Sequence, residues 1–132
     1  MAQEQISEHS LPEIILLAGR ILRISYSDAA SKALALLDRP LDIEMELYFS
    51  CLIRKRVYFR NNIRNEVFTR TTLNENISIS FRPVMTEVCL AGDVEDEPGV
   101  ETFPILKGEA FMPKWLAVNY KHGQWLGQFG YD

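Results

Sequence analysis

A basic, aromatic stretch lies near the middle of this 132-residue chain, whose net charge is −4. Residues 51–70 contain six of the chain's 14 lysines and arginines and a single acidic residue, Glu66. Guanidinium groups bind carboxylates and phosphates through paired hydrogen bonds, and a tyrosine ring can stack against a ligand. The candidate residues for binding an anion or a partner protein are Arg54, Arg56, Tyr58, Arg60 and Arg64.

An acidic stretch further along the chain offers the opposite charge. Residues 87–101 contain six acidic residues and no basic one, and the loop at residues 92–99 lacks the D-x-D-x-D-G spacing of an EF-hand calcium site. We expect this loop to face a partner, and the two charged stretches to neutralise each other within the chain or between subunits. The basic stretch is then interpreted as the solvent-facing side of a strand. The acidic candidates are Asp93, Glu95, Asp96 and Glu97.

Two short patterns partly resemble the PilZ domain, a family of cyclic di-GMP receptors. Arg56 and Arg60 form an R-x-x-x-R motif, and residues 76–78 follow it as the first part of the D/N-x-S-x-x-G motif of that family. Phe81 stands where the family has its last glycine, and the arginines lie in a strand-like run instead of a flexible segment. We therefore do not interpret the chain as a PilZ domain.

No catalytic constellation is visible in the sequence. The patterns of P-loops, dinucleotide-binding sites and serine hydrolases are all absent. His122 lies at an expected hairpin tip, where nothing would hold it against a substrate. The two histidines and two cysteines are too scattered for a zinc site. We assign no catalytic residue, metal or cofactor, and we favour a protein that is not an enzyme while leaving that question open.

Aromatic and small residues near the C-terminus indicate a second kind of site. Two tryptophans lie near Ala117 and Gly127, so aromatic walls would surround the volume that small residues leave. The alternative is that these rings pack in the core. The candidate pocket residues are Tyr48, Trp115, Asn119 and Trp125.

The elements that must position these residues begin with an expected helical pair. A capping-box pattern and apolar residues at helical spacing predict a helix over residues 11–25, although Gly19 and β-branched pairs leave a strand open. A second helix is expected over residues 28–38, after a cap at Ser27 or Asp28. We expect an α+β fold in which this N-terminal helical pair packs on a largely antiparallel β-sheet that ends in a C-terminal hairpin.

Alternation with period two is strongest over residues 43–59. Odd-numbered positions are mostly apolar and even-numbered positions mostly polar, which predicts a strand with one buried face. Its length predicts a bend, a bulge or a break near Lys55. The final hairpin is expected to have a three-residue loop, residues 121–123, which sets Tyr120 opposite Gln124 and gathers the tryptophans on one face.

The size and composition fit one globular domain. The chain is 47% hydrophobic and 24% charged, which is typical of folded proteins rather than disordered ones. We expect a mobile tail over residues 1–10 and a single domain over residues 11–132. The N-terminus lacks signal-peptide features, so we expect a cytoplasmic location, no membrane span, and free thiols at Cys51 and Cys89, with a disulfide left open.

Two functions from different classes fit these observations. The first is a small, soluble, non-enzymatic binding or adaptor module that acts through protein–protein interaction or self-association. Its partner is expected to be a protein or a second copy of the chain, rather than nucleic acid or a membrane. The alternative is a cone-shaped protein with an aromatic pocket that binds a small ligand or acts as a lyase or isomerase. The order of its expected elements resembles the fold of nuclear transport factor and scytalone dehydratase.

Overall fold

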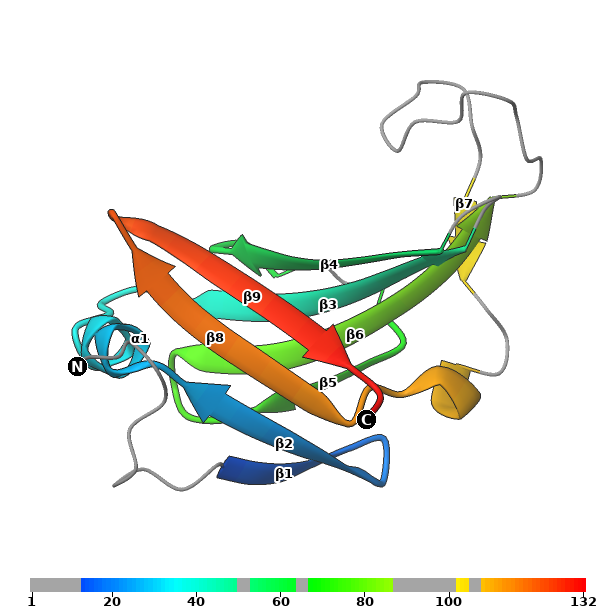
Figure 1. Ribbon diagram of the computed structural model, residues 1–132, viewed down its shortest axis with the longest axis horizontal. Coiled ribbons are helices and arrows are strands. Elements are labelled where there is room, and N and C mark those ends of the chain that lie inside the picture. The colour runs from blue at the N-terminus through cyan, green and yellow to red at the C-terminus, as the bar shows by residue number, and fades with distance from the viewer. Residues whose placement is uncertain (1–12, 50–52, 64–66, 87–101, 105–107) are drawn as a thin grey trace.

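Two β-sheets packed face to face make up most of the computed structural model, which describes residues 13–49, 53–63, 67–86, 102–104 and 108–132 (Figure 1). Sheet I has the strand order β1-β2-β8-β9, with β1 (Glu13–Leu17), β2 (Arg20–Tyr26), β8 (Trp115–Lys121) and β9 (Gln124–Gly130). Sheet II has the order β4-β3-β6-β5, with β4 (Ile53–Arg60), β3 (Leu41–Phe49), β6 (Ile77–Thr86) and β5 (Thr69–Thr72), and β7 (Thr102–Pro104) pairs with β6. Both sheets are mixed, because β2 pairs with β8 and β3 pairs with β6 in parallel.

The expected helical pair on a largely antiparallel sheet is wrong. Residues 13–17 and 20–26 form the β1–β2 hairpin, and the one α-helix in the described part of the chain is α1 (Asp28–Ala35). Ala18 and Gly19 both have positive φ, at 53° and 77°, as a two-residue type I′ turn requires. The apolar residues here fit helical and strand spacing alike. They form strands because the tight turn joins β1 to β2 and because β2 pairs with β8.

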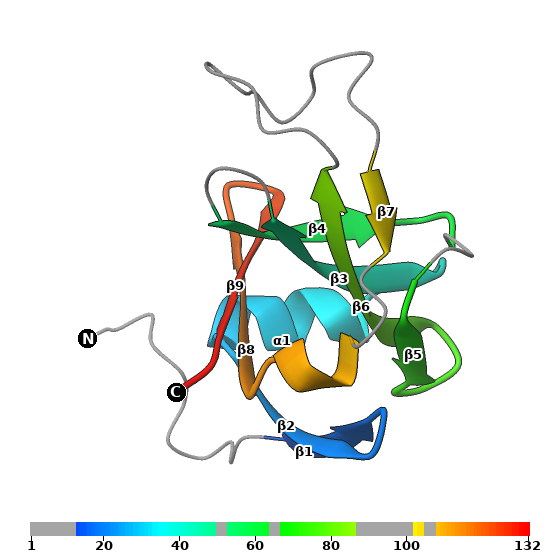
Figure 2. The same ribbon diagram turned by 90° about the vertical axis from the view of Figure 1, so that its right-hand side faces the viewer.

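Helix α1 covers one end of the space between the sheets (Figures 1 and 2). It begins as expected after Ser27, whose Oγ accepts a hydrogen bond from the Ala30 amide at 3.1 Å. This bond satisfies one of the N–H groups that the first turn of a helix leaves without a partner. The Ser27 hydroxyl also donates to Asn119 Oδ1 at 2.7 Å. The cap therefore ties α1 to β8. A short 3₁₀ helix, η1 (Gly108–Phe111), precedes β8.

The hydrophobic core lies between the two sheets. Ile43, Met45 and Leu47 of β3 are almost fully buried in it, so the alternation expected for this strand is confirmed on its inner face. The Phe81 ring of β6 meets the Phe129 ring of β9 edge to face, with centroids 6.5 Å apart. These contacts fix which face of each sheet turns outward.

The long strand expected over residues 43–59 is in fact two strands. β3 ends at Phe49 and β4 begins at Ile53, and the two residues face each other in an antiparallel pair. The break therefore precedes the expected position near Lys55. An odd number of residues separates the strands, so odd-numbered residues keep the inner face in both. The connection itself, residues 50–52, lies outside the described residues.

The C-terminal hairpin is present, but its expected register is wrong by one residue. Tyr120 pairs with Trp125, because the loop contains only His122 and Gly123, with φ of 52° and 76°. Two-residue type I′ loops match the twist of paired strands, and a one-residue shift moves side chains to the opposite face. Trp115 and Trp125 therefore lie on opposite faces of sheet I.

The two sheets meet at a seam between β9 and β4. The Trp125 ring stacks on Phe59 with centroids 5.6 Å apart and an interplanar angle of 18°. Beside it, a Cβ added to Gly127 would lie 2.8 Å from Val57 Cγ1. A glycine is required there because the strands approach too closely for any side chain.

Candidate functional site

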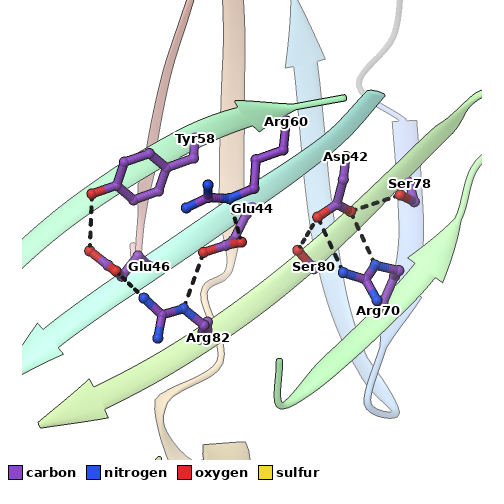
Figure 3. Close-up of polar contacts among 9 residues, drawn as sticks. All are labelled: Asp42, Glu44, Glu46, Tyr58, Arg60, Arg70, Ser78, Ser80 and Arg82. Atoms are coloured by element: carbon purple, nitrogen blue, oxygen red, sulfur yellow. Dashed lines mark hydrogen bonds and ion pairs between the residues drawn. The ribbon is translucent and has the colours of Figure 1, made fainter. Parts of the chain in front are cut away.

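Three carboxylates form a row along β3 on the outward face of sheet II (Figure 3). Asp42, Glu44 and Glu46 are only 1%, 0% and 8% exposed, although they point away from the core. Arginines from β4, β5 and β6 lie across them and exclude water. A buried carboxylate is unfavourable unless a nearby positive charge and hydrogen bonds compensate it. The row therefore depends on its arginines.

Asp42 is held in one orientation by four hydrogen bonds. The hydroxyls of Ser78 and Ser80 on β6 donate to its two oxygens at 2.7 and 2.8 Å. Arg70 on β5 donates to both oxygens at 3.3 and 3.4 Å. A carboxylate has about four acceptor sites, and these four bonds fill them. Asp42 therefore links three strands and is poorly placed to accept a substrate's proton.

Glu44 and Glu46 share Arg82 of β6. The Arg82 Nε donates to Glu44 at 3.2 Å and its Nη2 donates to Glu46 at 2.6 Å. Arg60 of β4 donates to the second oxygen of Glu44 at 2.9 Å, and the Tyr58 hydroxyl lies 3.5 Å from Glu46. The result is a continuous chain of ion pairs across β4, β3 and β6 (Figure 3). Such a network suits holding strands in register and presenting charge, rather than acid–base catalysis.

The structure places most of the basic candidates together on this face. Their shared face agrees with the alternation of β4, while their role in binding stays a prediction. The Arg54 guanidinium lies over the Tyr48 ring at 5.7 Å, and that of Arg60 lies over Tyr58 at 4.6 Å. The candidates on this face are Arg54, Arg56, Tyr58 and Arg60, whereas Arg64 lies outside the described residues.

The described acidic partner of Arg60 is Glu44 of β3, and neutralisation of the basic stretch by the acidic one stays a prediction. Residues 87–101, with the candidates Asp93, Glu95, Asp96 and Glu97, lie outside the described residues. The arginine side chains of β4 are partly buried, so this face is not simply solvated. Glu44 and Glu46 share the parity of the arginines across a hairpin, so their pairing was readable from the sequence. No local signal marks Arg70 or Arg82 as a partner of the β3 carboxylates.

Two residues of the partial PilZ pattern make contacts within the chain. Arg60 binds Glu44, and the Ser78 hydroxyl donates to Asp42. Both side chains therefore contribute to the ion-pair network of sheet II.

The four candidate pocket residues do not come together. Tyr48 lies on the outward face of sheet II, Trp115 and Asn119 share the outward face of sheet I, and Trp125 lies at the inner seam. Asn119 lines a depression of about 350 Å³ over β8 and β9, yet its Oδ1 already accepts hydrogen bonds from Ser27 and from the Tyr120 amide. Asn119 therefore has a structural role in the helix cap.

Among the described residues, no group of three or more histidines, cysteines or acids could hold a metal ion. No helix in this part of the chain is long and apolar enough to cross a membrane. His122 lies in the exposed β8–β9 loop, and Cys51 and Cys89 lie outside the described residues, as do residues 1–12.

Protein-family models, curated proteins and solved structures gave no match to this chain. The candidate sites are therefore defined by the geometry and charge of this chain's own residues.

A second surface lies on β1 and β2, on the outward face of sheet I. Ile14 and Leu16 are each 62% exposed, and Ile21 is 58% exposed. Leu16 and Ile21 are directly paired across the hairpin, and Ile14 shares their face. Contiguous exposed aliphatic side chains are typical of protein–protein contact surfaces. We name these three residues the β1 patch. A helix over residues 11–25 would not pair Leu16 with Ile21, so the expected helix hides this patch.

The β1 patch borders a sheet edge at which no further strand pairs among the described residues. β1 is the last strand of sheet I, and the two-residue turn makes Leu17 and Arg20 a hydrogen-bonded pair. By alternation, the N–H and C=O groups of Ile14 and Leu16 then point away from β2. Natural edge strands are usually protected by lysine, proline or a bulge. In the strand EIILL the single charged residue is Glu13, at its end.

Proposed function

We propose that this chain is a non-enzymatic interaction module that self-associates by pairing β1 with β1 of a second copy. The observation that carries the proposal is the apolar edge strand with its three adjacent, exposed aliphatic side chains. A free apolar edge is a template for strand addition.

The sequence of β1 is complementary to itself in an antiparallel two-fold arrangement. A register centred on Ile15 places Ile14 opposite Leu16 of the second copy, and both residues direct their backbone groups to the shared edge. The two β1 patches then form one stripe on the joined sheet. Glu13 faces an apolar Leu17 of the second copy, so no like charges oppose each other. Isologous contacts of this kind generate closed dimers.

The first test compares Leu16→Lys with Leu36→Lys by light scattering after size exclusion, over a range of protein concentrations. Leu36 is a matched control, because it is 82% exposed and lies beyond the end of α1. We expect the unchanged protein and Leu36→Lys to form dimers as concentration rises, and Leu16→Lys to stay monomeric because charge blocks edge pairing. A monomer at every concentration, or a dimer that tolerates Leu16→Lys, contradicts the proposal.

A cross-linking test examines the register, in a background where both native cysteines are serines. Ile15 lies on the two-fold axis as a non-hydrogen-bonded pair, with Cα atoms about 4.5 Å apart, within the range of a disulfide. Ile14 and its copy are diagonal neighbours at roughly 7 to 8 Å, too far for one. Ile15→Cys should therefore form a covalent dimer under mild oxidation faster than Ile14→Cys. Equal rates would reject this register.

A further inference from the structure

The outward face of sheet II carries more positive than negative charge. Its described strands place five arginines against three carboxylates on this face, a net charge of +2 on a chain whose total charge is −4. We name it the arginine face: Arg54, Arg56, Arg60, Arg70, Arg82, Asp42, Glu44 and Glu46. Its excess positive charge favours the binding of an anionic partner at this face.

We infer that the arginine face is a binding site for an extended, acidic peptide segment, separate from the β1 edge. Arg54 and Arg56 occupy alternate positions of β4 and so stand about 6.6 Å apart, the repeat of alternate residues in any extended strand. A peptide running along β4 with an acid at every second position can therefore place successive carboxylates over successive arginines.

Arginines of this face already bind carboxylate groups of the chain itself. Arg60 and Arg82 each bind Glu44, and Arg70 binds both oxygens of Asp42. The guanidinium planes are further positioned by tyrosine rings, with Arg54 over Tyr48 and Arg60 over Tyr58. Arginines whose orientation is fixed in advance lose less freedom when they bind a further carboxylate.

A nucleic acid fits the same face less well. Its affinity grows with the number of phosphates that lysines and arginines neutralise, and here Asp42, Glu44 and Glu46 lie among the arginines. The buried carboxylates leave an excess of only two positive charges over four strands. A peptide of alternating acidic and neutral residues matches this low density of charge.

The test uses fluorescence anisotropy with a labelled synthetic peptide in which glutamate alternates with threonine. Arg56→Gln is compared with Lys55→Gln, which removes the same charge from the adjacent, exposed position on the other face of β4. We expect binding that weakens with added salt, a loss of about tenfold for Arg56→Gln, as for one charge-assisted contact, and little change for Lys55→Gln.

Three results would overturn the inference. These are no binding to the unchanged protein, equal losses for the two variants, or tighter binding of a single-stranded oligonucleotide of the same net charge. The Leu16→Lys variant should bind the peptide as the unchanged protein does. Failure of the β1 dimer therefore leaves this site intact, and failure of this site leaves the dimer intact. Thermal unfolding of each variant verifies that it is folded.

Discussion

Glu44 shows how a single charged residue can be buried on the outward face of a sheet. It has no exposed surface, and each of its oxygens accepts a hydrogen bond from a different arginine, Arg60 or Arg82. The ion pairs offset a desolvation cost of several kcal/mol. The two arginines keep 28% and 18% of their side chains exposed, so each can serve Glu44 and still face solvent.

Removing this one charge should destabilise the fold. We expect Glu44→Gln to lower the free energy of unfolding by about 3 kcal/mol or more, because two partly buried guanidinium groups lose their shared carboxylate. Urea denaturation measures the change. Asp38→Asn is the control, since Asp38 pairs with Arg39 at the surface, at 3.8 Å and 88% exposed. Its cost should stay below about 0.5 kcal/mol. Similar costs for both variants would show that the ion-pair row is dispensable.

At the scale of elements, tight turns determine which side chains of each strand point to the core and which point outward. The β1–β2 and β8–β9 hairpins both use two-residue loops with positive φ. The second loop fixes Tyr120 opposite Trp125, and so directs Trp125 to the seam with Phe59 of β4. Gly127 of β9 allows that approach.

The seam between β9 and β4 leads to a prediction about Gly127. Gly127→Ala should destabilise the protein by about 1 to 3 kcal/mol, because the new methyl group would overlap Val57 and approach Phe59 at 3.1 Å. Thermal unfolding measures the loss. Val57→Ala removes Cγ1, the atom that lies nearest to the new methyl group, so the double variant should be more stable than the sum of the two single changes predicts. Strict additivity would show that the strands separate instead of clashing.

At the scale of the whole molecule, two half-buried tyrosines connect stability to pH. Burial raises the pKa of Tyr131 to about 12, and its hydroxyl donates to the Phe111 carbonyl at 2.7 Å. Burial, followed by the hydrogen bond to Glu13 and the charge of that residue, also raises the pKa of Tyr26. The folded state therefore favours the neutral form of both tyrosines over the ionised form.

Stability should therefore decline in alkaline solution. An unfolded tyrosine ionises near pH 10, whereas Tyr131 in the folded chain keeps its proton to about pH 12. The stabilisation is complete below the lower of these values and is lost as the pH rises through the higher one. The free energy of unfolding, measured by urea titration from pH 9 upward, should fall over this window. Tyr131→Phe should make that fall shallower, and an unchanged slope would contradict the assignment.

The two proposed surfaces would combine in the assembled molecule. A dimer joined through β1 would carry two arginine faces, one on sheet II of each copy. Two acidic segments linked in one partner would then bind more tightly than either alone, provided that the linker spans both faces.

The sequence by itself determined the features that depend on neighbouring residues. Alternation along residues 43–59 identified the inner face of β3 and the shared face of Arg54 and Arg56, and Ser27 marked the start of α1. These signals are local, because a strand alternates every second residue and a helix cap acts within one turn.

Only the tertiary structure decided the rest. Residues 11–25 fit two periodicities, and pairing of β2 with β8, some ninety residues away in the chain, selected strands. Arg70 and Arg82 reach the β3 carboxylates across ladders between strands distant in sequence, so no local pattern predicted that those acids would be buried. A loop shorter by one residue than expected separated Trp115 from Trp125. Which face is covered, and by which neighbour, is set by long-range packing that alternation cannot encode.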